Sequence, residues 1–403
     1  MFKVSGMTKN NNSLTWLGMA VVILVASNLR SPITSVGPVL GEIQDALHLD
    51  NVQGSLLTSI PLIVFATCSI LVSRLAAKAN INYGIIFSLV VLIAGLYFRV
   101  SGSVAMLYLG SFLLGLGICI GNVTTPAYIK NVFPKNVGVV TGIFSVSMNL
   151  LGALASGLSI SIGQWTNAGW KGSLGVWIIW AFLTLLMVIA DTLTTKNRSR
   201  KSSAPDMGRS EFNIFRSKQS WNISFFMGLQ SVMYYCLVAF LPTILIDYGM
   251  DKTDAGWVIS IMQLSMLPVM FIGPVIASKI EDQKWMIYGI GLLLFAGLSM
   301  LAVFQAQYIY LSSILIGMSG GLSFSLCLLF FSIKCKTPEG TLKLSGKAQS
   351  IGYLIAAFGP PVFGMLHDWD ATWKASIYFL LIIGVLMTII GRFAAKPRYV
   401  EEY

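Results

Sequence analysis

Residues 14–41 read LTWLGMAVVILVASNLRSPITSVGPVLG, and Arg30 is the single ionisable side chain in this apolar stretch. If the stretch is one membrane-spanning helix with Trp16 at an interface, the helical rise puts Arg30 roughly 21 Å further along, near the middle of a bilayer. An arginine at that depth costs about 2.5–3.5 kcal/mol on insertion scales. Such a charge is tolerated where it faces a wet cavity, so Arg30 indicates a binding site for an anionic or strongly dipolar solute. The alternative is that Arg30 bonds neutral groups and braces the bundle.

The composition is that of an integral membrane protein. Of the 403 residues, 55% are hydrophobic and 11% are charged, against about 25% charged residues in soluble domains. The apolar runs have the length of helices, and not of the alternating strands of an outer-membrane barrel. We therefore predict an all-α membrane protein with twelve transmembrane helices, near residues 14–41, 52–77, 81–99, 104–131, 138–163, 172–194, 220–247, 253–278, 285–304, 307–333, 344–366 and 373–395.

One polar segment rich in Ser, Lys and Arg divides the predicted helices into two equal sets. We expect a tail at 1–13, a six-helix bundle at 14–194, a linker at 195–219, a second six-helix bundle at 220–395 and a tail at 396–403. The halves are related by a shift of 204 residues, which maps Pro38 onto Pro242 and Gly142 onto Gly346. Such an internal repeat is typical of transporters built from two pseudo-symmetric bundles.

The placement of the basic residues predicts the topology. With the N-terminus in the cytoplasm, 22 of the 27 Lys and Arg residues fall on cytoplasmic segments, and the outside loops hold only Arg99, Lys171, Lys252 and Lys374. This asymmetry follows the positive-inside rule, so we expect both termini in the cytoplasm and the chain in the cell membrane. The net charge of +11 is then explained by the basic residues on the cytoplasmic side. We therefore expect no nucleic-acid partner.

The sequence carries no signature of an enzyme, a metal site or a cofactor. It lacks a phosphate-binding loop and the HExxH zinc motif, and its five cysteines show no paired spacing. None of its sixteen carboxylates lies in the middle of a predicted span, which disfavours coupling through a membrane-embedded acid. The coupling ion, a proton or an exchanged anion, stays open. The expected partners are a small-molecule substrate and the lipid bilayer, and the expected state is a monomer.

Uncharged polar residues supply the rest of a candidate site. The 204-residue shift carries Arg30 onto Tyr234, so pseudo-symmetry predicts the two on opposite walls of one central cavity. Asn and Gln side chains in membranes also form hydrogen bonds between helices. For each such candidate, this structural role is the alternative to substrate contact. The candidate substrate contacts are Arg30, Asn28, Asn122, Tyr234, Gln230, Gln263, Gln349 and Tyr353. The candidates for helix bending and gating, or else for static packing, are Pro38, Gly142, Pro242, Gly346, Pro360 and Pro361.

Four segments resemble the major facilitator superfamily, and within it the cyanate/nitroimidazole porter family: NLRSPIT at 28–34, LLTSIPLIVFA at 56–66, GICIGNVTTPAYIKNVFP at 117–134 and LSGKAQSIGYLIAAFGP at 344–360, with HD at 367–368. The resemblance implies a site between the halves with Arg30 on the substrate and Asn122, Gln349 and Tyr353 near it. One departure is the loop SRLAAKANINYG, which keeps basic residues but lacks the acid of the superfamily's Gly-x-x-x-Asp-Arg pattern. Gate contacts based on that pattern are therefore not carried over.

We therefore expect a secondary active transporter that moves a small polar or anionic solute, cyanate-, nitrate- or nitroimidazole-like, by alternating access. One alternative is a multidrug or toxic-compound efflux carrier of the same fold, whose many Met and Phe side chains would line an adaptable cavity. An alternative of another class is a non-transporting membrane receptor or channel.

Overall fold

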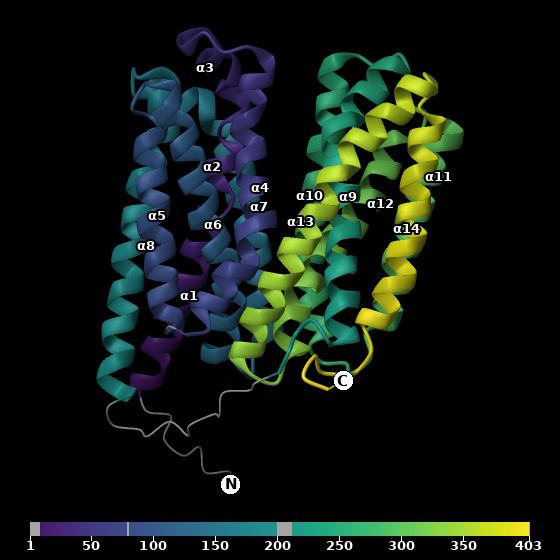
Figure 1. Cartoon of the computed structure of the whole chain (residues 1–403). Helices are drawn as coiled ribbons and strands as arrows, with labels where there is room; N and C mark the ends of the chain where they lie inside the picture. Colours follow the sequence, from purple (N-terminus) through teal and green to yellow (C-terminus); the bar gives the residue numbers. More distant parts are fainter. Residues whose placement is uncertain (1–8, 79, 200–211, 403) are drawn as a thin grey trace. The chain divides into compact units, whose positions relative to one another are not determined.

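The computed structural model describes residues 9–78, 80–199 and 212–402, and all regular structure in these residues is helical (Figure 1). Twelve helical segments are long and apolar enough to cross a membrane, which confirms the predicted spans and the all-α class. The elements are α1 Lys9–Asn28, α2 Ser31–Thr34, η1 Gly37–Val39, α3 Leu40–Leu47, α4 Asn51–Ala76, α5 Ile81–Arg99, α6 Val104–Val132, α7 Val137–Trp165, α8 Gly169–Ser199, α9 Lys218–Asp247, α10 Lys252–Ala277, α11 Lys284–Phe304, α12 Ile309–Ile333, α13 Pro338–Trp369 and α14 Lys374–Ala394.

The helices cluster into two compact units whose borders cut through α4 and α7. The first unit holds Met1–Pro61, Ala79–Val132 and Ser147–Arg209, and the second holds Leu62–Lys78, Phe133–Val146 and Ser210–Tyr403. The second unit includes the C-terminal part of α4 and the N-terminal part of α7. The division into two six-helix bundles at the linker, which the sequence suggests, stays a prediction.

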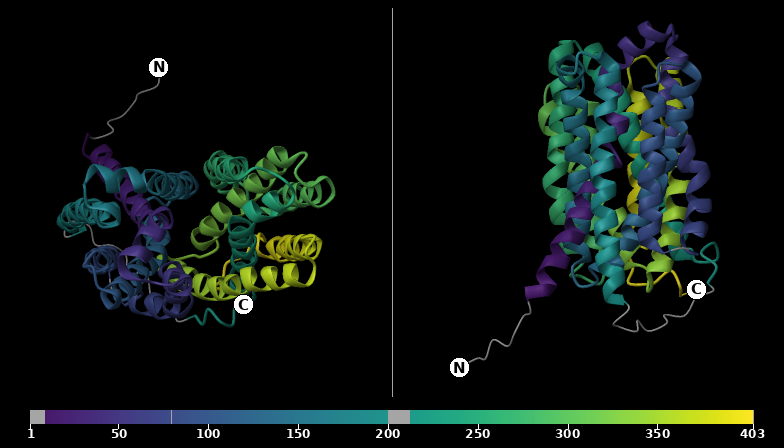
Figure 2. Two further views of the ribbon diagram at one scale, coloured as in Figure 1. Left: turned by 90° about the horizontal axis from the view of Figure 1, so that it is seen from above. Right: turned by 90° about the vertical axis from the view of Figure 1, so that its left-hand side faces the viewer.

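Within each unit the helices run alongside one another (Figure 2). In the first unit α5 packs along α6 and α8, and α1 packs against α8 and α6. In the second unit α9 packs on α13 and α14, and α12 packs on α10 and α11. Apolar helices have no hydrophobic preference for one another over lipid, so close contact through small residues and polar links holds such bundles together.

Two glycines related by the sequence repeat make equivalent close contacts in the second unit. A Cβ atom on Gly142 of α7 would lie 2.9 Å from the carbonyl oxygen of Phe271 on α10. A Cβ atom on Gly346 of α13 would lie 2.6 Å from the carbonyl oxygen of Ser69 on α4. The 204-residue shift relates α7 to α13 and α4 to α10. The contact of α7 with α10 and the contact of α13 with α4 are therefore related by the sequence repeat. The gating role of these glycines stays a prediction.

The predicted prolines fall into two groups. Pro38 lies in η1, where the first span is irregular, whereas α9 continues through Pro242 and α13 continues through Pro360 and Pro361. Proline removes one backbone hydrogen bond in the interior of a helix, which favours a bend without ending the helix in a packed bundle.

The expected linker at 195–219 is largely structured at both ends. Helix α8 continues to Ser199, and residues 212–217 lead into α9, whose N-terminus is capped by the hydroxyl of Ser217. Ile214 and Ser217 are both buried. Residues 200–211 of the expected linker, and residues 1–8 of the expected N-terminal tail, lie outside the described part of the chain. We call the end of each unit that the linker joins its linker end.

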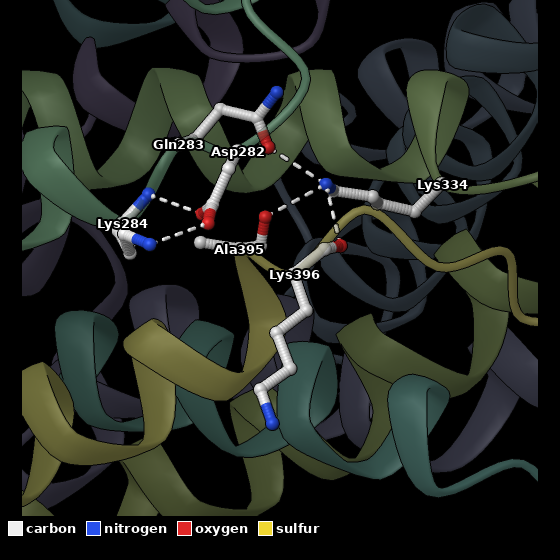
Figure 3. Close-up of polar contacts among 6 residues, drawn as sticks. All are labelled: Asp282, Gln283, Lys284, Lys334, Ala395 and Lys396. Atoms are coloured by element: carbon white, nitrogen blue, oxygen red, sulfur yellow. Dashed lines mark hydrogen bonds and ion pairs between the residues drawn. The ribbon is translucent and has the colours of Figure 1, made fainter.

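The C-terminal tail, expected at residues 396–403, is docked at the linker end of the second unit by a buried lysine. The Lys334 ammonium donates hydrogen bonds to the carbonyl oxygens of Ala395 and Lys396, at 2.9 and 2.8 Å, and to the side-chain oxygen of Gln283 at 2.7 Å (Figure 3). The backbone N–H of Val400 donates in turn to the Lys334 carbonyl at 2.8 Å. Burial lowers the pKa of Lys334 to about 8, although the nearby Asp282 carboxylate acts in the opposite direction.

This lowered pKa predicts that docking of the tail strengthens at alkaline pH. The docked state binds the proton less tightly than a free lysine with a pKa of 10.5, so between about pH 8 and 10.5 the undocked state holds more protons and rising pH favours docking. Hydrogen exchange of the 396–402 amides, corrected for intrinsic rates, should show about threefold or greater protection at pH 9.5 than at pH 7.5.

The variant Lys334→Met should remove this pH dependence, whereas a change at the exposed Lys279 should leave it intact. Protection that stays flat or declines from pH 7.5 to 9.5 in the unmodified protein would contradict the assignment.

Candidate functional site

The first membrane span is broken where Arg30 lies, so the expectation of one continuous helix was wrong. Helix α1 ends at Asn28, a turn covers residues 29 and 30, and the chain continues through α2, η1 and α3. Pro32 and Pro38 cannot donate a backbone hydrogen bond, and each disfavours helical backbone in the residue before it. Irregular backbone at membrane depth is tolerated where protein buries it or where it lines a wet cavity.

Arg30 is half-buried at this break and packs its aliphatic stem against α7. A Cβ atom on Gly152 would lie 2.8 Å from Cγ of Arg30, so only glycine leaves room for the stem in its present position. The Thr34 hydroxyl donates to the carbonyl oxygen of Gly152 at 2.7 Å, which fastens α2 to the same point of α7. The break therefore contacts α7 at Gly152 through both the Arg30 stem and the Thr34 hydroxyl.

A second guanidinium supports the break, and the sequence did not reveal it. Arg99 was expected in an outside loop, but it is the last residue of α5 and is 1% exposed. Its Nη1 atom donates to the Pro32 carbonyl oxygen at 2.9 Å. A helix interrupted by proline leaves backbone carbonyl groups that need other hydrogen-bond donors. The prolines were therefore the one feature of the sequence that indicated a donor at this place. Nothing in the sequence showed that Arg99 would be that donor.

The residues just before Arg30 link α1 to α8. The Asn28 amide donates to the Thr184 hydroxyl at 2.8 Å and to the Leu24 carbonyl oxygen at 2.8 Å. Trp180 of α8 donates its indole N–H to the Ser27 hydroxyl at 2.7 Å. These contacts favour the role of a helix link for Asn28 over direct contact with a solute.

Polar atoms nevertheless gather around the break. Within the described residues, Oδ1 of Asn28, the hydroxyls of Ser31 and Ser35, and Nε of Arg99 are buried and have no protein hydrogen-bond partner. Buried polar groups are almost always satisfied by protein or by ordered water. The surroundings of the break are thus markedly more polar than those of an ordinary membrane helix.

The other candidates are distributed over both units. In the first unit Asn122 is half-buried on α6. In the second unit Gln230 and Tyr234 of α9 line one small cavity of about 20 Å³, together with Met233, Met262 and Met266. The Gln230 amide donates to the Ser231 hydroxyl at 2.8 Å. The structure therefore brings two of the predicted residues together, in a setting rich in methionine.

The candidates on α10 and α13 have different surroundings. Gln263 is half-buried on α10, and Gln349 is buried on α13. Tyr353 lies one turn after Gln349, and its ring centroid is 5.1 Å from that of Phe65 on α4. No cluster of three or more His, Cys, Asp or Glu side chains that could hold a metal ion occurs in the described residues.

The sequence of this twelve-helix protein matches a known family. The sequence profile described as Major Facilitator Superfamily matches residues 15–342. The chain belongs to the major facilitator superfamily. It is therefore a multi-pass membrane transporter and not an enzyme, in agreement with the prediction from the sequence.

Several curated facilitators match along nearly the full chain. The uncharacterized transporter YycB of Bacillus subtilis (strain 168) is 35% identical, and the alignment covers 96% of this chain and 95% of the relative. The 2-nitroimidazole transporter of Escherichia coli (strain K12) is 29% identical, with coverage of 95% and 96%. The cyanate transport protein CynX of Escherichia coli (strain K12) is 26% identical, with coverage of 93% and 97%.

Solved facilitator structures share the fold. The proton:xylose symporter XylE, bound to 6-bromo-6-deoxy-D-glucose, aligns with a TM-score of 0.76 at 13% identity and covers 97% of this chain and 98% of its own. FucP in the outward conformation aligns with a TM-score of 0.73 at 14% identity, with coverage of 94% and 98%. At this level of identity the likeness concerns the fold alone.

The packing of Arg30 against α7 predicts that this facilitator tolerates no side chain at residue 152. The substitution Gly152→Ala should lower the free energy of unfolding by about 1–3 kcal/mol, because the added methyl group overlaps the arginine stem. Thermal unfolding of the purified protein measures the change.

Gly157→Ala is the matched control on the same helix, since a Cβ atom there meets nothing within 4 Å. Equal melting temperatures for the two variants would show that the arginine stem is not confined by α7.

Proposed function

We propose that this facilitator moves a small anion, or a compact solute with concentrated negative charge, across the cell membrane by alternating access. The observation that carries the proposal is a permanent positive charge, Arg30, at a break in a membrane-spanning helix. Broken helices near the middle of the bilayer are where many secondary transporters bind their substrates. The two termini lie in the cytoplasm in this proposal, following the distribution of basic residues.

The chemistry of the guanidinium narrows the substrate class. It is planar, always protonated and presents donors as a fork, which matches carboxylate-like and linear anions. The names of two relatives agree with this chemistry, because cyanate is a monoanion and a nitroimidazole has partial negative charge concentrated on its nitro oxygens. We therefore propose a cyanate-, nitrate- or nitroimidazole-like solute, bound by Arg30.

The uncharged candidates complete the proposed site. Asn122 in the first unit, and Gln230, Tyr234, Gln263, Gln349 and Tyr353 in the second, offer neutral donors and acceptors. Asn28 is a weaker candidate because its amide is already directed to Thr184. Neutral polar groups of this kind fix the orientation of a solute without adding a charge that would hold it too tightly.

The position of the acids bears on coupling. Asp191 lies near the end of α8, and its carboxylate accepts a hydrogen bond from the Tyr128 hydroxyl at 2.8 Å. Among the described residues, the other acids in spans also lie near helix ends. This distribution favours exchange of anions over a proton relay through a carboxylate in the middle of the membrane.

Substitution of Arg30 tests the proposal. Arg30→Ala should reduce uptake of labelled cyanate, nitrate or 2-nitroimidazole into proteoliposomes roughly 10- to 100-fold, since hydrogen bonds to a charged group contribute about 1.5–3 kcal/mol. Arg30→Lys keeps the charge but loses the fork, so it should restore only a small part of the uptake.

The matched control is Lys171→Ala, which removes an exposed positive charge from the loop region at the start of α8. Undiminished uptake by a folded Arg30→Ala protein would refute the role of Arg30. Competition by bulky cationic dyes, with none by small anions, would favour the multidrug carrier instead.

A further inference from the structure

A basic cavity lies at the linker end of the second unit, and none of its lining residues is among the candidate substrate contacts. Its volume is about 300 Å³, and its walls come from the end of α4, the segment that precedes α9, and the beginning of α13. Three of its lining side chains, Arg74, Lys343 and Lys347, are basic, and none of the lining residues that the structure describes is acidic. The transport function proposed above makes no use of these residues.

Lys347 is a buried cation held only by neutral groups. It is 1% exposed, and its ammonium donates to the Ser220 hydroxyl at 2.6 Å and to the Ile214 carbonyl oxygen at 3.2 Å. The ammonium also lies 3.9 Å from the centroid of the Trp221 ring. No acidic side chain forms an ion pair with it in the described residues. A buried charge without a counter-charge is costly, so an anion in the adjoining cavity would stabilise this arrangement.

The other two basic residues are held beside Lys347 by the helix packing. Lys343 precedes it by one helical turn and so lies on the same face of α13. Its ammonium forms an ion pair with Glu339, at 2.8 Å. Arg74 lies in the last turn of α4. It forms no ion pair with any residue that the structure describes. The close contact of Gly346 with Ser69 and Ser73 brings the end of α4 against the beginning of α13.

The length of α13 indicates that the cavity opens near the level of lipid headgroups. Helix α13 has 32 residues and is therefore about 48 Å long, whereas the hydrocarbon core of a bilayer is about 30 Å thick. If the excess is shared between its ends, Lys343 lies at the boundary of the hydrocarbon and Lys347 about one turn deeper. Phosphate groups, free in solution or on lipids, are present at the level of Lys343, and the cavity extends inward from there to Lys347.

We propose that this cavity is a binding site for a phosphate group, held by Arg74, Lys343 and Lys347. Arginine presents two parallel N–H donors to phosphate oxygens, and lysine presents a single point charge. Three basic side chains and the one carboxylate paired with Lys343 leave the site with an excess of positive charge. The phosphate comes either from an anionic phospholipid headgroup or from soluble phosphate. Because the site joins α4, the segment before α9 and α13, the bound group would hold these three elements together.

Two binding measurements on the purified full-length protein test the proposal and distinguish the sources. The first is thermal unfolding in sodium phosphate and in sodium chloride of equal ionic strength, since a ligand of the folded state raises the melting temperature by mass action. The second is native mass spectrometry of retained lipid, comparing phosphatidylglycerol with phosphatidylcholine. Neither measurement depends on transport.

Four variants make the measurements specific. Arg74→Gln and Lys343→Gln should each weaken binding about tenfold, and Lys347→Met should weaken it further. Lys279→Gln removes an exposed charge elsewhere in the second unit and should leave binding unchanged. If Lys347→Met does not fold, the two glutamine variants still decide the result.

The outcomes separate the two sources. A melting shift in phosphate that the variants diminish identifies soluble phosphate, and retention of phosphatidylglycerol that they diminish identifies the lipid. The absence of both effects, or effects that remain equal in Arg74→Gln, Lys343→Gln and the unmodified protein, would overturn the proposal.

Discussion

The structure depends on how the chain satisfies a broken helix within a membrane. Pro32 and Pro38 interrupt the backbone hydrogen bonds of the first span, and lipid offers no replacement partners. The protein supplies one from a neighbouring helix, because Arg99 donates to the Pro32 carbonyl oxygen. The side-chain hydroxyl of Thr34 donates to the Gly152 carbonyl oxygen and so links the break to α7. Arg30 thus lies in a segment that is held by hydrogen bonds to neighbouring helices. A rigid backbone of this kind keeps the orientation of a functional side chain fixed.

The sequence predicted the fold well because hydrophobic length is a strong signal. Twelve apolar runs, the repeat and the polar linker were sufficient to predict twelve spans, and the equivalent contacts of Gly142 and Gly346 follow the same repeat. The break itself was missed, although both prolines were visible. Proline also occurs inside α9 and α13, which continue through it, so proline alone does not distinguish a bend from a break. Tertiary contacts decide between them.

The candidate site was less predictable, because it depends on which partner each polar side chain finds. Asn28 and Gln230 were chosen on equal grounds, yet Asn28 links two helices and Gln230 lines a cavity. Arg99 counted as a loop residue because it ends an apolar run, and only the packing of α5 shows that it is buried. The lysines at the linker end show the same limit: Lys334 and Lys347 followed the positive-inside pattern, but their burial against carbonyl oxygens, a hydroxyl and aromatic rings is a property of the fold.

The borders of the second unit have a consequence for the dissection of this protein. Because that unit takes residues 62–78 and 133–146 from before the linker, a fragment that starts after the linker lacks two of its own building blocks. The surface of α10 at Phe271 and the surface of α13 at Gly346 would then face detergent or lipid without their matching helices. Split-protein and half-length expression strategies, which treat each set of six spans as self-sufficient, are therefore poorly suited to this chain.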